Sequence, residues 1–338
     1  MRPKKKLSIL KRIKNSRLGI GLYYAFIDRA FGREHRAVVA GKLAHVGSGA
    51  TVDAQRYLLR RNVHRLEKGL IMRPMRPVFA LDYIGETVTA YERVVAADRC
   101  DAGREGELRW FDSVLSRYFE VVGQAPQVAS FRERFVRARQ AGADTRTGSI
   151  PYAASERPGC AVNYEEFLLL CRRRRSVRWF LDRPVPREAI ERAVDAARQA
   201  PSACNRQPFQ FVVAEGKARA AEIGAIPMGT QGFAEGFPAI VVMVGDLSAY
   251  FDERDRHLIY IDASLAAMQF MLACETLGLA TCPINWPDIE EREVKMDAAL
   301  GLKPHERPVM LIALGYPDPT GGVPFSEKRS VGHLVRYL

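Results

Sequence analysis

The spacing of apolar residues changes character along the chain. Residues 51–69 carry an apolar stripe at helical spacing, with Thr51 as a candidate N-cap and Gly69 as a candidate left-handed C-cap. Residues 123–162 show no apolar period and are rich in Gly, Ala, Ser and Thr. We therefore expect a helical N-terminal extension over 1–122, a linker over 123–162 and a separate domain over 163–338.

The last part of the chain mixes helical and strand patterns. Asn163 followed by Glu166 predicts a helix start of the capping-box type, and 186–200 has the pattern of an amphipathic helix. The stretch 259–279 is apolar on nearly every face, so we expect it in a core or a subunit interface. Four runs rich in β-branched residues predict strands: 208–216, 237–246, 280–285 and 307–317.

Most of the excess charge lies in one short segment. The chain has 338 residues and a formal net charge of +12. Residues 1–36 hold eleven Lys or Arg against Asp28 and Glu34, a net charge of +9, so the rest of the chain is nearly neutral. We call residues 1–36 the basic arm. It lacks interleaved aromatics at a stacking spacing, so nucleic acid is not the expected partner.

Two interpretations of the basic arm stay open. Its apolar run at 18–27, next to many cations, suits peripheral contact with an anionic membrane surface. The same apolar side chains would equally suit a fixed helix packed on the core. We expect a cytoplasmic protein, which under the first interpretation would be located at the inner membrane surface.

The cysteines and glycines exclude some chemistries. The six cysteines fall at no paired or metal-like spacing, which favours reduced thiols and no metal site. Gly19 and Gly21 lack the third glycine of a dinucleotide fingerprint, because Tyr24 stands in its place.

The segment 172–180, RRRRSVRWF, raises the question of an anion. Arginines at a helix end are often solvated and favoured by the helix dipole. The planar guanidinium is also well suited to phosphate, because it donates two hydrogen bonds at once.

Five separated blocks of the sequence resemble the nitroreductase family of FMN-dependent reductases over roughly 164–338. The blocks are RRSVRWF, RPVPREAIERAVDAARQAPSACNRQPFQFVV, IDASLAAMQFMLACETLGLATCPINW, LIALGYP and EKRSV. The resemblance implies an α+β fold with a mostly antiparallel central sheet flanked by helices, and a homodimer with FMN at the subunit interface.

The resemblance also implies roles for the cations. Arg174, Arg175 and Ser176 would hold the FMN phosphate and ribityl chain. Arg178 would lie beside the pyrimidine edge of the flavin, where a positive charge stabilises the reduced anionic ring. Lys328 and Arg329 correspond to a late basic pair at the phosphate.

The segment PSACNRQPF, 201–209, resembles the family segment that reaches the flavin of the neighbouring subunit. Pro201, Ser202, Asn205 and Gln207 would be its flavin contacts. The same residues are also ordinary turn formers, so a structural role is open beside the functional one.

Further contacts are implied at the strand end CPINW, 282–286. Pro283, Ile284 and Asn285 would face the flavin ring, and Asn285 and Trp286 are the catalytic candidates next to N5, through their backbone. Gln231 and Gly315 are additional candidates for cofactor contact.

The extension carries one motif of its own, HRLEKG at 64–69. On a helix His64, Glu67 and Lys68 share a face, which predicts a local ion network. Functionally, the same face could close over the flavin pocket and exchange protons.

The resemblance implies an oxidoreductase that passes hydride from NAD(P)H through FMN to a nitro, quinone or related acceptor by a ping-pong mechanism. Two alternatives remain: a flavin-fragmenting or dehalogenating member of the same fold, and a non-catalytic binding module with a degenerate flavin fold. The sequence does not name the acceptor.

Overall fold

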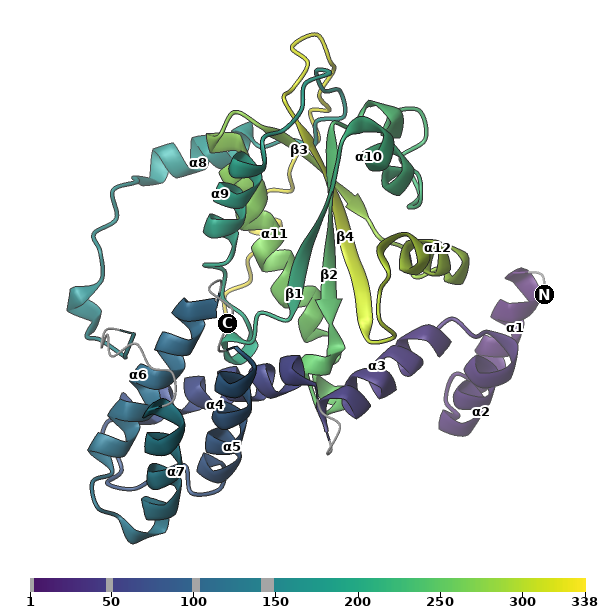
Figure 1. The fold of residues 1–338 in the computed structure, drawn as a ribbon. Coiled ribbons are helices and arrows are strands. Elements are labelled where there is room, and N and C mark those ends of the chain that lie inside the picture. Colours follow the sequence, from purple (N-terminus) through teal and green to yellow (C-terminus); the bar gives the residue numbers. More distant parts are fainter. Residues whose placement is uncertain (1–2, 47–50, 99–103, 141–148) are drawn as a thin grey trace.

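The computed structural model describes residues 3–46, 51–98, 104–140 and 149–338, and its centre is an antiparallel sheet (Figure 1). The strands are β1 (Phe209–Glu215), β2 (Ala239–Asp246), β3 (Ala280–Asn285) and β4 (Glu306–Gly315). They lie in the order β1-β2-β4-β3, and every neighbouring pair is antiparallel. The predicted α+β fold with an antiparallel central sheet is confirmed.

Helices cover both faces of the sheet. On one face α9 (Arg187–Ala197) and α11 (Leu258–Thr276) pack against Val241, Met243 and Ile312. On the other face α10 (Lys217–Gly224) and α12 (Glu290–Leu300) pack against Val242, Ile284 and Leu311. Every residue of β2 is buried, because alternate side chains enter the two opposite cores.

The first helix of this domain, α8 (Tyr164–Arg173), begins with the predicted capping box. Asn163 Oδ1 accepts a hydrogen bond from the Glu166 amide at 2.9 Å, and Glu166 accepts one from the Asn163 amide at 3.2 Å. A long connection, residues 149–163, runs to α8 from the N-terminal helices (Figure 1).

The N-terminal extension forms its own helical cluster. It consists of α4 (Val52–Leu70), α5 (Ile84–Ala97), α6 (Glu105–Val121) and α7 (Ala129–Gln140), which share one apolar core. The linker prediction needs correction here. Val128 and Phe135 are buried in this core, so α7 belongs to the cluster although it falls within 123–162. Residues 141–148 and Cys100 lie outside the described residues.

The predicted C-cap at Gly69 is wrong, because the residue is helical. Thr51 caps α4 as expected, accepting a hydrogen bond from the Ala54 amide, but the helix continues to Leu70. Gly69 is instead a packing position, since a Cβ there would lie 2.2 Å from Cε2 of Phe79.

The extension also docks on the sheet domain. α3 (Gly32–His45) crosses the turn after β2, and a Cβ at Gly41 would lie 2.6 Å from the Leu247 carbonyl oxygen. Arg33 pairs with Glu290 and Asp297 of α12 at 2.9 and 2.7 Å. The extension is therefore joined to the core by both close packing and ion pairs.

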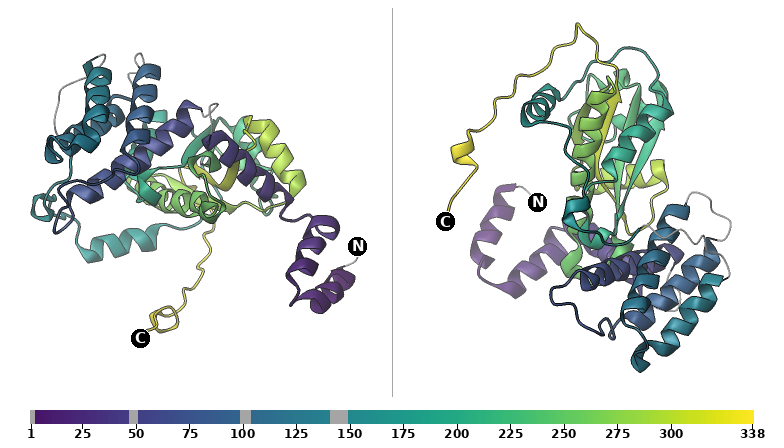
Figure 2. Two further views of the ribbon diagram at one scale, coloured as in Figure 1. Left: turned by 90° about the horizontal axis from the view of Figure 1, so that it is seen from below. Right: turned by 90° about the vertical axis from the view of Figure 1, so that its left-hand side faces the viewer.

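The two ends of the chain project from the body (Figure 2). The N-terminal helices α1 (Pro3–Ile13) and α2 (Arg17–Leu22) continue into a short π-helical turn, Tyr23–Ile27. Within the apolar run Tyr23 is buried, whereas Leu18 and Phe26 are exposed. Beyond β4 the C-terminal segment extends away from the sheet, with Phe325 and Tyr337 exposed.

The predicted apolar helix is α11, and it is not uniformly buried. Ala263, Ala267 and Phe270 face the sheet, while Ile261 and Leu265 remain exposed. The stretch Glu253–Thr276 is long and apolar enough to cross a membrane, a test that core helices also pass.

We predict that Gly69→Ala destabilises the helical cluster by about 1–3 kcal/mol, because the new methyl group overlaps the Phe79 ring. Gly106→Ala is the matched control, since a Cβ at Gly106 in α6 meets nothing within 4 Å. Thermal unfolding followed by circular dichroism should show a lower midpoint for the first variant only. Equal midpoints would contradict the packing role.

Candidate functional site

The arginine run leaves its helix at the point where it meets the sheet. Arg174 is the C-cap of α8 and has extended backbone angles. The chain then runs beside the start of β3: Ser176 forms a bridge with Thr281, and the Val177 amide donates to the Thr281 carbonyl at 3.0 Å. This pairing fixes the arginine segment against the edge strand.

Predicted phosphate-binding residues converge on one small cleft. The cleft has a volume of about 150 Å³ and is lined by Arg174, Arg175, Ser176, Arg178, Pro324, Ser326 and Lys328. Nε of Arg174 is buried and has no hydrogen-bond partner among the described residues. Lys328 Nζ donates to the Ser326 carbonyl at 3.0 Å. None of the described residues that line the cleft is acidic, so the cleft gathers positive charge.

The other arginines of the run are placed differently. Arg172 is exposed, and Arg173 pairs with Glu275 at 3.2 Å. Burial raises the pKa of the Glu275 carboxyl, while the Arg173 cation acts against this rise. Burial likewise raises the pKa of the Cys282 thiol, and the nearby Arg178 and Arg174 cations oppose it. The solvated interpretation therefore fits Arg172, and not Arg174.

The end of β3 borders a second, larger cleft of about 430 Å³. Pro283, Ile284, Asn285 and Trp286 line it together with residues of α11 and β4. Asn285 is exposed, but the indole of Trp286 is buried and donates a 2.7 Å hydrogen bond to Glu293. The indole is therefore engaged elsewhere, and any contact of Trp286 with a ligand in this cleft would be through its backbone. This is the role that the sequence analysis expected for it.

The loop before β1 lies at the other end of the sheet. Its neighbour Phe209 pairs with Gly245, which in turn pairs with Arg307 near the start of β4. Thr281, beside Ser176, pairs with Leu314 at the end of β4. The ten residues of β4 span roughly 30 Å, so Ser202 and Asn205 are well separated from the arginine cleft within one chain.

Three further candidates differ in how close they lie to the arginine cleft. Gln231 is exposed on a segment next to the cleft, because Arg178 lies 5.8 Å from the ring centroid of Phe233. Gly315 is a packing position, where a Cβ would lie 2.8 Å from Cγ of Pro238. Arg329 is not among the residues that line the cleft, and it donates to the His333 carbonyl at 3.0 Å.

Comparison with known proteins decides the family. The model described as "Nitroreductase family" matches residues 171–231 and 225–316. The chain is 32% identical over 155 residues to a proposed NADH dehydrogenase/NAD(P)H nitroreductase of Archaeoglobus fulgidus, covering 45% of this chain and 86% of that protein. The chain belongs to the nitroreductase family.

This nitroreductase-family enzyme has relatives with different names. It is 25% identical over 180 residues to FMN reductase [NAD(P)H] of Bacillus subtilis, covering 48% of this chain and 71% of that protein. It is also 23% identical over 219 residues to iodotyrosine deiodinase 1 of Mus musculus, covering 55% and 75% of the two chains. The family match begins at residue 171, so the helical extension lies outside it.

The sequence interpretation missed contacts around the loop of this family member. Arg60 in α4 donates to the Asn205 carbonyl, and Asp262 in α11 accepts from the Ala203 amide. Arg206 is buried over the ring of Tyr250, with 4.8 Å between guanidinium and ring centroid. The signal for Asp262 was available, since it is an acidic residue in the apolar first half of the helix pattern.

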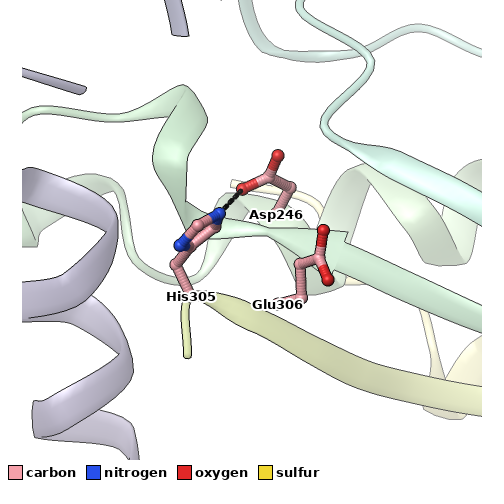
Figure 3. A group of neighbouring side chains, drawn as sticks. All are labelled: Asp246, His305 and Glu306. Carbon is pink, nitrogen blue, oxygen red and sulfur yellow. Dashed lines mark ion pairs between the residues drawn. The ribbon is translucent and has the colours of Figure 1, made fainter. Parts of the chain in front are cut away.

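A cluster of potential metal ligands lies where the extension meets the nitroreductase-family domain (Figure 3). His305 points toward Asp246, with 3.7 Å between Nε2 and Oδ1, while Glu306 extends beside them. Asp246 already accepts from the Ser248 amide at 2.8 Å and from the Tyr57 hydroxyl at 3.1 Å. Because these groups have protein partners, we assign the cluster to joining the two parts of the chain.

The HRLEKG motif forms part of the predicted network. His64 Nδ1 lies 3.4 Å from Glu67 Oε2, and Glu67 Oε1 accepts from the indole of Trp110 at 2.9 Å. Lys68 is exposed. These contacts are internal to the helical cluster of the enzyme, which favours the structural interpretation of the motif.

Proposed function

We propose that this enzyme binds FMN and passes hydride from NAD(P)H to an electron-poor acceptor, such as a nitro or quinone compound, by a ping-pong mechanism. The observation that carries the proposal is the cleft in which Arg174, Arg175, Arg178 and Lys328 converge without an acidic lining residue. A buried guanidinium nitrogen without a partner is costly, and a phosphate oxygen would satisfy it. The residues present therefore fit the phosphate of FMN.

The arrangement along β3 suits an extended ligand with one anionic end. Ser176 lies opposite Thr281, and Asn285 lies four residues further along the same strand, roughly 13 Å away. FMN, when bound, supplies the two-electron chemistry between NAD(P)H and acceptor. The chain's part is to hold the phosphate with Arg174, Arg175 and Lys328 and to place the Arg178 cation where negative charge would develop.

A second candidate is reductive dehalogenation at the same site. It is favoured by the similarity to the deiodinase of Mus musculus, which extends over 55% of this chain. Release of iodide from iodotyrosine, with NAD(P)H as the reductant, would distinguish this reaction from nitro or quinone reduction.

We expect Arg174→Ala to weaken FMN binding by roughly 10–100-fold, because a charge-assisted hydrogen bond to phosphate is lost. Arg172→Ala is the matched control from the same arginine run, since Arg172 is exposed outside the cleft. Titration of the apoprotein with FMN, followed by flavin fluorescence, measures both affinities. Equal losses, or no FMN binding by the wild type, would reject the phosphate assignment.

We further propose that the enzyme is a homodimer in which the loop 201–207 of one chain completes the flavin site of the other. Support comes from the separation of this loop from the arginine cleft along β4. Exposed apolar side chains also follow one face of α11, at Ile261, Leu265 and Met268. The described residues of the chain leave between 39% and 52% of each of these residues uncovered.

A mixed dimer tests the crossing of the loop. One subunit carries Arg174→Ala and the other Asn205→Ala, with different tags for purification. If the loop crosses, one site holds both substitutions and the other holds none, so turnover should return to about half that of the wild type. If loop and cleft act within one chain, both sites stay defective. A stable flavin-loaded monomer in light scattering would also refute the dimer.

We also propose that the basic arm contacts an anionic membrane surface from the cytoplasmic side. Leu18, Leu22 and Phe26 are exposed, and the cations Lys11, Arg12, Lys14, Arg17 and Arg29 around them are exposed as well. Each such cation near anionic lipid contributes about 1 kcal/mol. Not all of the arm's charge is free, because Arg33 pairs with α12 and Lys6 with Asp28.

Deletion of residues 1–31 should abolish binding to phosphatidylglycerol vesicles, while FMN content and NAD(P)H oxidation persist. This deletion leaves Arg33 and α3 in place, so the docking of the extension is kept. Vesicle co-sedimentation at low and high salt measures the binding, with phosphatidylcholine vesicles as the control. Full-length protein that stays in the supernatant at low salt would contradict the proposal.

A further inference from the structure

The loop between α9 and β1 has an unusual backbone. Cys204, Asn205 and Gln207 have φ angles of 54°, 52° and 51°, in the left-handed region that non-glycine residues rarely adopt. Such a conformation persists only where surrounding contacts impose it. The contacts that impose this backbone conformation therefore also shape the site that the loop lines.

The loop's own domain supplies some of the contacts. Ser202 Oγ accepts from the Gln207 amide at 3.0 Å, and Asp262 accepts from the Ala203 amide at 2.9 Å. The Gln207 side chain donates from Nε2 to the Arg198 carbonyl at 2.7 Å. None of these three bonds involves the carbonyl of Asn205 or the side-chain oxygen of Gln207.

The helical extension contacts these two oxygens. Arg60 in α4 donates from Nε to the Asn205 carbonyl at 2.8 Å and from Nη2 to Gln207 Oε1 at 2.8 Å. One planar guanidinium thus holds two of the three left-handed residues. Among the described residues of the extension, Arg60 is the one whose side chain forms hydrogen bonds with this loop.

Arg60 is itself held in place before it meets the loop. Its Nη1 donates to Glu107 of α6, and its guanidinium lies 5.3 Å from the ring centroid of Trp110. Glu107 also accepts from Arg56, which pairs with Asp98 at 2.7 Å. The side chain of Arg60 is only 13% exposed, so its orientation is set by the helical cluster.

We propose that Arg60 is a positioning residue for the oxidoreductase reaction, through which the helical extension holds the loop 202–207 in the conformation that completes the flavin site. This rests on the proposed function, in which that loop lines the flavin of the neighbouring subunit. The extension is then a working part of the active site, because the helical cluster fixes the guanidinium and the guanidinium fixes the loop.

The chain offers a matched pair of variants for the test. Arg60→Lys keeps the charge and removes the planar fork that reaches two acceptors at once. Arg56→Lys makes the same change one turn earlier. Arg56 bonds to the same Glu107, and its other hydrogen-bond partner is Asp98 rather than the loop. Arg60→Ala removes the contact altogether.

Two measurements on the flavin-loaded dimer separate positioning from general stability. Hydrogen exchange of a peptide covering 202–208 reports the loop directly, and kcat/KM for a nitro or quinone acceptor reports the reaction. In Arg60→Ala we expect loop exchange to rise and kcat/KM to fall by roughly tenfold, the equivalent of one charge-assisted hydrogen bond. Arg60→Lys should lie between this variant and the wild type, and Arg56→Lys should match the wild type in both measurements.

The proposal is overturned if Arg60→Ala leaves loop exchange unchanged. It is also overturned if Arg56→Lys changes exchange and kcat/KM as much as Arg60→Lys, because both residues would then act through the stability of the cluster. A wild type without NAD(P)H-dependent turnover would reject the proposed function instead. In that case the exchange experiment alone still decides whether Arg60 holds the loop.

Discussion

The structure depends on the burial of both faces of β2 and β4. These central strands send alternate apolar side chains into two cores, and each core needs its own layer of helices. With both faces covered, polar chemistry is left to the edge strands and to the ends of the sheet. The arginine cleft beside β3 and the loop before β1 lie in these places.

Ion pairs within the extension differ in how much they contribute to stability. The pair between Lys6 and Asp28 is partly exposed and contributes little, as exposed pairs generally do. Arg56 and Asp98 are both buried, so removing one of them would leave the other charge without compensation. The helical cluster is therefore tolerant of change at its surface and sensitive to the loss of a charge in the network around Glu107.

Much of the fold was predictable, because its signals are local. All four strands stand out as β-branched runs bounded by Gly or Pro, and Asn163 with Glu166 marks the start of α8. α7 was not predicted, although Val128, Phe131 and Phe135 lie at helical spacing. The Gly- and Ala-rich residues that follow it obscured this short apolar pattern. The role of Gly69 depends on Phe79, a tertiary neighbour that no local pattern reveals.

The site was predictable only where its residues are close in the chain. The arginine run and its serine occupy one short segment, so their convergence needed no knowledge of the fold. The contact between Arg60 and Asn205 joins residues 145 positions apart, and it depends on how the extension docks. No spacing in the sequence marks such a pair.

The docking of the extension also sets the order in which parts of the chain fold and associate during translation. The helical cluster α4–α7 can close its own core from residues within 51–140, soon after these leave the ribosome. Its attachment to the sheet domain must wait, because Tyr57 bonds to Asp246, 189 residues later. The cluster ends at residue 140, 106 residues before Asp246, so at ordinary elongation rates that interval is roughly 5–20 s. During it the docking face of the nascent cluster has no partner from its own chain, which makes this interval the natural point for chaperone protection.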